Sequence, residues 1–248
     1  MKKRHLIGKM TMEIYDLEDN LLTEIPLVTR KGINQVYWIP VQNPPSPPAS
    51  DAIPFQMQIA LMGGGMEYPA GDYKVKVTRN DQVYEKTITV YNNPDLPYSE
   101  EDRELKREYQ KIGFGLMEDL AYADRQINDV LNGLQNLENL PGISNSTLQY
   151  ADELRSGLED VRNRMMVTQY GDLRGEAKLR EEVGFLNGII AFYGGRPTQV
   201  QMDHMALLKK RVNSLVNEVD ELLKILEKIN KGIEKAGGKT ITVISRED

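Results

Sequence analysis

The stretch PDLPYSEEDREL, residues 94–105, marks the boundary between two kinds of secondary structure, because the spacing of the apolar residues changes there. Before this stretch apolar and polar residues alternate, as from Met10 to Ile14, and after it apolar residues recur every three or four positions. Alternation is typical of β-strands, and the longer period is typical of α-helices. The sequence therefore predicts an α+β protein of two domains, with strands in residues 1–95 and helices in residues 99–237.

Short alternating runs separated by turn residues fill the first domain. They predict strands at residues 9–15, 21–28, 33–39, 54–62, 72–78 and 83–91. Asp and Asn residues between the runs tolerate the backbone of tight turns, as at Asp16 to Asn20. Six short strands, each with one apolar face, predict an antiparallel β-sandwich.

The second domain contains four predicted helical segments. They are expected at about residues 99–140, 146–170, 175–193 and 198–236. Ser99 with Asp102, and Thr198 with Gln201, have the spacing of capping boxes at helix starts, and Ser146 is the expected start of the second segment. The segments predict an antiparallel bundle of four helices, or of three if the middle two form one broken helix.

The first and fourth segments are long and carry apolar residues at heptad spacing. At a rise of about 1.5 Å per residue each spans roughly 55 Å, so we expect them to pair along their length, and the same seams could join copies into a homo-oligomer. Glycines inside helices predict close backbone contacts, at Gly113, Gly115, Gly133, Gly184 and Gly188. Alternation at 239–245 predicts a terminal strand within residues 238–248, without a partner inside the bundle.

Composition excludes several classes of site. The formal net charge is -6, with 31 Lys and Arg against 37 Asp and Glu, so we expect no nucleic-acid partner. The chain has no Cys and two His, which removes thiolate chemistry and most metal sites. No apolar run reaches the roughly 20 residues of a membrane span. We therefore predict no catalytic, cofactor-binding or metal-binding residues and no membrane insertion.

Two groups of side chains remain as candidates for chemistry. Trp38 with Tyr37, Tyr68 and Tyr73 could form an aromatic platform, on which Trp38, Tyr37 and Tyr68 would stack against a sugar ring. The alternative is that a lone Trp belongs to the core. Carboxylate pairs could serve a glycosidase. They are expected on solvated helix faces or at a helix start: Glu100-Glu101-Asp102, Asp152-Glu153, Glu159-Asp160 and Glu181-Glu182. His204 is expected at the surface or half-buried on a helix.

Several motifs resemble a known protein family. In the first domain they are GINQVYW at 32–38, YPAGDYKVKV at 68–77, QVY at 82–84 and TITV at 87–90; later ones are NPD at 93–95, GRPTQ at 195–199 and IEKAGG at 233–238. The first set is similar to the flagellar hook-capping Ig-like module. Together they resemble the C-terminal region of bacterial sortilin-like proteins, which are exported β-propeller proteins often labelled glycosyl hydrolases. Ile39 and Asn93-Pro94-Asp95 depart from the family pattern.

The resemblance implies an Ig-like domain followed by a helical bundle, in a periplasmic or secreted protein. The S-x-D-x-G-x-T-W repeats of the family's propeller do not occur in this sequence, so a hydrolase label does not transfer. No signal-peptide core follows Met1, and we expect the chain to be a separately encoded, truncated or excised tail of such a protein. The expected function is a non-catalytic structural module that docks on and stabilises a β-propeller of its own or a partner chain. The alternative is a carbohydrate-binding accessory module of a glycoside hydrolase.

Overall fold

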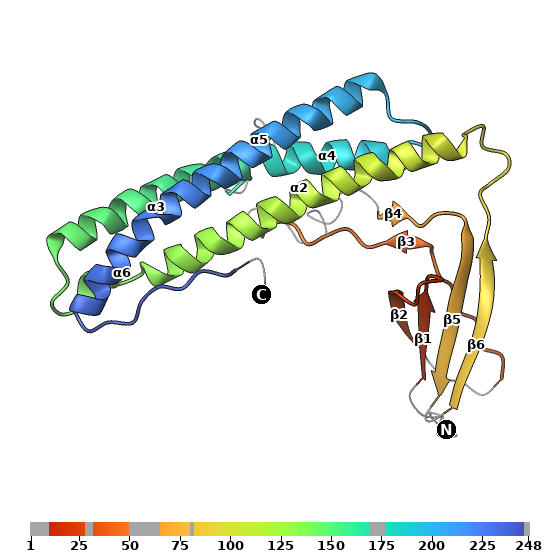
Figure 1. Ribbon diagram of the computed structural model, residues 1–248, viewed down its shortest axis with the longest axis horizontal. Helices are drawn as coiled ribbons and strands as arrows, with labels where there is room; N and C mark the ends of the chain where they lie inside the picture. Colours follow the sequence, from red (N-terminus) through yellow and green to blue (C-terminus); the bar gives the residue numbers. More distant parts are fainter. Residues whose placement is uncertain (1–9, 28–31, 50–64, 80–81, 169–176, 246–248) are drawn as a thin grey trace, which may run out of the picture. The chain divides into compact units, whose positions relative to one another are not determined.

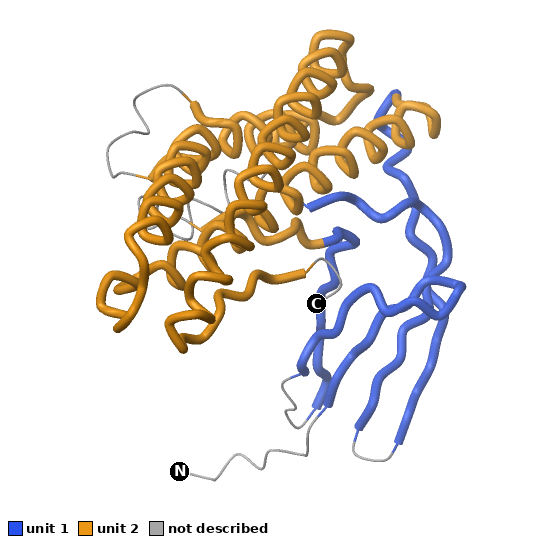
Figure 2. Tube along the Cα trace, turned by 60° about the vertical axis from the view of Figure 1, so that its left-hand side comes forward, with its two compact units in different colours: residues 1–42, 65–97 blue, residues 43–64, 98–248 orange. Residues whose placement is uncertain are grey.

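The computed structural model describes residues 10–27, 32–49, 65–79, 82–168 and 177–245 (Figure 1). The protein is α+β and divides into two compact units (Figure 2). Residues 1–42 and 65–97 form the first, which we call the sheet unit, and residues 43–64 and 98–248 form the second, the helical unit. Residues 43–64 lie within the N-terminal range of the sequence but belong to the helical unit.

The sheet unit contains a four-stranded antiparallel sheet in the order β2-β1-β5-β6. Its strands are β1 (Met10–Tyr15), β2 (Leu21–Leu27), β5 (Gly71–Arg79) and β6 (Gln82–Val90). The turn after β1 is closed by Asp16, whose Oδ1 accepts hydrogen bonds from the backbone N–H groups of Glu18 and Asn20, each at 2.9 Å. Four of the predicted strands are therefore confirmed within one or two residues at each end.

The register places the apolar residues of this sheet on one face. Met12 lies opposite Ile25 and Val77, and Ile14 lies opposite Val75. The face is incompletely covered, because Met12, Ile25, Val75 and Val77 are only half-buried whereas Ile14 is fully buried. The apolar face of this sheet is therefore only partly covered by other residues of the described chain.

A second sheet consists of two short antiparallel strands, β3 (Val41–Gln42) and β4 (Met66–Glu67). The predicted strand at 33–39 is wrong: these residues form no strand. Ile33, Tyr37 and Ile39 are exposed, so the alternation in this segment has no paired neighbour and no buried face to follow. The predicted strand at 54–62 lies outside the described residues.

The helical unit is built from long helices (Figure 1). They are α2 (Glu100–Gly133), α3 (Asn145–Met165), α4 (Leu179–Phe192), α5 (Gln199–Leu223) and α6 (Ile225–Lys235), with a 3₁₀ turn at Leu137–Asn139. Both capping boxes, at Ser99 and Thr198, are confirmed. The start of α3 was predicted two residues late, because Ser144 is the cap and its Oγ accepts from the N–H of Thr147 at 3.2 Å. Lys224 divides the predicted fourth segment into α5 and α6.

One continuous hydrophobic core fills the helical unit. Fully buried members come from every long helix: Leu120 and Ile127, Leu154 and Leu158, Val183, Leu208 and Val212, and Ile229. α2 packs against α4 and α5, and α3 packs against α6 and α5. The heptad positions of the first and last helices are therefore buried within this one chain.

The C-terminal segment, residues 239–245, is held by helix side chains. The prediction of a strand here is wrong, since the segment forms no strand. The amide of Asn230 on α6 makes two hydrogen bonds to the backbone of Ile241: Nδ2 donates to its carbonyl and Oδ1 accepts from its N–H, both at 2.9 Å. Asp129 Oδ2 accepts from the N–H of Ile244 at 3.0 Å. These side chains satisfy the backbone groups that a neighbouring strand would otherwise pair.

Two of the helix glycines make the close contacts that were predicted. A Cβ on Gly133 would lie 2.6 Å from Cγ2 of Ile241, and a Cβ on Gly113 would lie 2.6 Å from Oδ1 of Asn187. A Cβ on Gly115 would meet nothing within 4 Å, so for this residue the prediction is wrong. Because Gly133 has no side chain, Ile241 of the C-terminal segment can pack directly against α2.

Candidate interaction surface

α4 exposes only large hydrophobic side chains to solvent. Phe185 is 51% exposed, Ile189 is 56% exposed and Phe192 is 80% exposed, and every other residue of α4 is buried or half-buried. A helix on the surface of a globular protein normally turns polar residues to water. α4 is instead apolar on its solvent side as well as on its core side.

The orientation of α4 is determined by its packed side. Val183 and Ile190 join the core, and Asn187 lies against Gly113 of α2. Residues three or four apart share one face of a helix, so burial of these positions leaves Phe185, Ile189 and Phe192 together on the opposite side. Tyr193, the C-cap residue, is also half-exposed and continues the same stripe.

The exposed apolar surface extends onto α5. Val200, His204, Leu207 and Arg211 are three or four positions apart and share one face of that helix. Arg211 Nη1 donates to Glu182 Oε2 of α4 at 2.6 Å, and His204 Nε2 lies 3.8 Å from the same oxygen. These contacts turn this face of α5 toward the side of α4 that carries Glu182.

We name the combined surface the α4–α5 patch. It consists of Phe185, Ile189, Phe192, Tyr193, Val200 and Leu207, each of them half or more exposed. A fully exposed aromatic side chain presents roughly 150–250 Å², and Val, Leu and Ile present less. The partly exposed side chains of the patch therefore present about 600 Å² of apolar area, at the upper limit of the largest patch on an ordinary monomer. Patches of this size are often functional.

The sheet unit brings together two of the three candidate sugar-stacking residues. The rings of Trp38 and Tyr68 have centroids 6.3 Å apart, and Trp38 meets Tyr73 edge-on at 5.4 Å. The Tyr68 hydroxyl donates to the carbonyl of Leu22 at 3.3 Å, and burial raises the pKa of Tyr68. Tyr37 is exposed and lies outside this cluster. The rings pack on one another at an angle and do not form one flat platform.

Tyr73, the fourth aromatic residue of the predicted platform, is the buried member of the aromatic cluster. It is buried, and its hydroxyl donates to the carbonyl of Pro69 at 2.5 Å. The alternation of β5 predicts the burial of Tyr73. Val75 and Val77 follow it at two and four positions, so all three side chains point to the same apolar face of the sheet.

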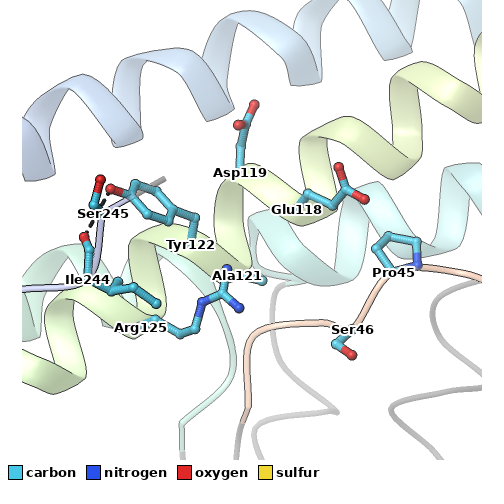
Figure 3. Close-up of a pocket in the computed structure, with 9 residues that line it drawn as sticks. All are labelled: Pro45, Ser46, Glu118, Asp119, Ala121, Tyr122, Arg125, Ile244 and Ser245. Atoms are coloured by element: carbon cyan, nitrogen blue, oxygen red, sulfur yellow. Dashed lines mark hydrogen bonds between the residues drawn. The ribbon is translucent and has the colours of Figure 1, made fainter. Parts of the chain in front are cut away.

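A polar pocket lies along α2, and two acidic residues, Glu118 and Asp119, are among the residues that line it. It has a volume of about 540 Å³ and is lined by Pro45, Ser46, Glu118, Asp119, Ala121, Tyr122, Arg125, Ile244 and Ser245 (Figure 3). Figure 3 shows Tyr122 beside the C-terminal segment, where its hydroxyl donates to the carbonyl of Ile244 at 3.2 Å. Glu118 is exposed and adjacent to Asp119, so the two side chains leave the helix about 100° apart. They do not converge as the acid pair of a glycosidase does.

Glu181 is buried, which corrects its predicted place on a solvated face. Arg180 is buried beside it: its Nε donates to Glu181 Oε1 at 2.7 Å, and its Nη1 donates to the carbonyl of Pro48 at 2.9 Å. A buried charge is tolerated when it is paired and hydrogen-bonded. This pair therefore fastens residues of the 43–49 segment to α4. Glu182, its neighbour, is the half-buried partner of Arg211.

A second buried charge lies on α2. Asp124 accepts from Nε of Arg162 at 3.1 Å and from Nδ2 of Asn128 at 3.2 Å, and it also accepts from the backbone of Ala49. Burial raises the pKa of the Asp124 carboxyl, and the neighbouring Arg162 opposes that rise. Asp124 and Arg180 thus hold the same short segment from two helices.

In the described part of the chain no three His, Cys, Asp or Glu side chains gather as a metal site would require, and no helix there is long and apolar enough to cross a membrane. His204 is half-exposed on α5, as predicted. No family model matches the chain, and no curated protein or solved structure matches it significantly. Function must therefore be argued from the surfaces of the molecule.

Proposed function

We propose that the chain is a non-catalytic structural module that docks on and stabilises a β-propeller, on its own chain or on a partner. The observation that carries this proposal is the apolar face of the four-stranded sheet, on which only Ile14 and Tyr73 are buried among the described strand residues. An antiparallel sheet normally packs its apolar face on a core. A second protein surface would complete that core.

The edge of this sheet supports the same function. β6 is an edge strand, and residues 82–87 along it are exposed. Tyr84 lies opposite Val77 and is therefore on the apolar face, where its ring remains exposed. An exposed edge strand can accept a further strand from a partner protein.

The resemblance to sortilin-like proteins supplies the class of partner. We propose that the two sheets are a reduced Ig-like sandwich and that the long helices form an antiparallel bundle, as in that family's C-terminal region. The partner is then the β-propeller of an exported sortilin-like protein, and the place of action is periplasmic or extracellular.

Titration of the purified chain against an immobilised sortilin-like propeller tests the proposal. We expect saturable binding that Tyr84→Asp weakens at least about tenfold, since a charge would be buried at the contact. Glu85→Ser is the matched control, because Glu85 is exposed on the same strand but points to the opposite face. Failure of the wild-type chain to bind, or equal binding by Tyr84→Asp, would overturn the proposal.

A further inference from the structure

We propose that the α4–α5 patch pairs two copies of this chain about a two-fold axis that passes near Ile189. This goes beyond docking on a propeller, which concerns the sheet unit, and it uses a different surface. A two-fold interface presents the same patch from both copies, so the patch must be complementary to itself.

The spacing of residues along α4 meets that requirement. Phe185 precedes Ile189 by four positions, and Phe192 and Tyr193 follow it by three and four. When a second α4 crosses in the antiparallel direction with the Ile189 side chains facing, Phe185 of each copy meets Phe192 and Tyr193 of the other. Aromatic rings at such positions can pack edge-to-face, which adds to the burial of their area.

The area of the patch fits a small stable dimer. Burying about 600 Å² on each copy gives roughly 1,200 Å² in total, the lower bound for specific interfaces between proteins. Val200 and Leu207 widen the contact beyond one helix pair, so the interface does not depend on α4 alone.

Charge at the patch favours a second copy over a charged partner. Glu182, Arg211 and His204 are the charged groups between α4 and α5, and Glu182 already pairs with Arg211 at 2.6 Å. On α5 beside Leu207 the exposed charges are Asp203 and Lys210, one of each sign. The patch therefore offers no unbalanced charge for a basic or acidic partner to neutralise, and two identical patches meet without a local repulsion between like charges. The patch is therefore complementary to a second copy of itself, both in its balanced charge and in the spacing of its apolar residues.

This interface differs from the one expected from heptad spacing. Leu208, Val212, Leu215 and Val219 of α5 belong to the core of the helical unit. They are already packed against the chain's own helices and have no apolar area left for a second copy. Helix α4, which the sequence pattern did not single out, carries the exposed surface.

The absence of cysteine from the sequence makes a direct test simple. Ile189→Cys introduces the only thiol, and a disulfide forms between copies only when the two Cα atoms approach within about 7 Å. We expect mild oxidation to convert Ile189→Cys to a covalent dimer. Ser156→Cys is the matched control: Ser156 is exposed on α3, away from the patch, and should stay monomeric on denaturing gels.

A mixing experiment tests the antiparallel direction. Phe185→Cys and Tyr193→Cys chains, one carrying a size tag, should form the mixed disulfide several-fold more than either forms with itself. Preferential Phe185 to Phe185 linkage would indicate a parallel pair and would overturn the proposed axis.

Sedimentation equilibrium supplies the second readout, in the unmodified chain. We expect a mass of twice 28.2 kDa that Ile189→Asp and Phe192→Ser reduce to one chain, with unchanged helix content by circular dichroism because both side chains are exposed. A wild-type chain that is monomeric at tens of micromolar overturns the proposal; so does a dimer that both variants leave intact. A monomer would assign the patch to another protein.

Discussion

The helical unit and the sheet unit differ most in how much each buries. Within the described residues, the buried hydrophobic side chains of the sheet unit are Ile14, Met66 and Tyr73, whereas all the others belong to the helical unit. Because hydrophobic stabilisation grows with buried apolar area, the helical unit has a core of its own. The sheet unit depends more on strand pairing and on one aromatic cluster. The comparison indicates that the sheet unit is the part that gains more from a partner.

The largest effect is expected in the core of the helical unit. Leu120 is fully buried in α2, and Leu120→Ala should lower the free energy of unfolding of this unit by about 3–5 kcal/mol, from lost burial and the cavity left behind. Far-UV circular dichroism in urea follows the helices. Trp38, the only Trp, reports on the sheet unit by fluorescence. We expect the first transition to move and the second to stay; a common shift would mean that the two units unfold together.

The corresponding experiment in the sheet unit replaces Ile14, which is fully buried. Ile14→Ala should destabilise the sheet unit by about 2–4 kcal/mol, and the Trp38 transition should move to lower urea while the helical signal stays in place. A loss below about 1 kcal/mol would contradict the view that Ile14 is the centre of this small core.

A smaller effect is expected where the C-terminal segment lies on the helical unit. Asn230→Ala removes both hydrogen bonds to Ile241 and leaves its partly buried N–H and carbonyl unpaired, so we expect a loss of about 1–3 kcal/mol. Hydrogen exchange of the Ile241 and Ile244 amides should accelerate in the variant. Asn213→Ala, at an exposed position of α5, is the matched control and should change neither quantity.

The smallest effect concerns the pH dependence of the helical unit. Burial raises the pKa of Asp124 in the folded chain, so the folded state holds its proton to a higher pH than the unfolded state does. The contribution of Asp124 to stability is therefore greatest below its unfolded pKa and is lost as the pH rises through the folded value. We expect the free energy of unfolding of the wild type, relative to Asp124→Asn, to fall as the pH rises above about 4, the pKa of an unperturbed Asp. A rise over that range would mean that Arg162 outweighs burial.

Local features of the fold could be predicted because they depend on neighbours in sequence. The capping boxes at Ser99 and Thr198 use side chains three positions apart, and the turn at Asp16 is closed within five residues. The strands from Met10 to Leu27 follow the alternation directly. The candidate aromatic site was predicted in part: Trp38, Tyr68 and Tyr73 meet, whereas Tyr37 is exposed and lies apart.

What the sequence determined by itself was the period of each region, the helix starts after Ser99 and Thr198, and the α+β class, since backbone hydrogen bonding and capping act over a few residues. Only the tertiary structure decided which face of α4 meets water, where residues 239–245 find their hydrogen bonds, and why Glu181 is buried beside Arg180. The physical reason is that burial depends on contacts between residues far apart in the chain. When a helix such as α4 has apolar residues on both sides, its own sequence does not show which side the rest of the molecule will cover.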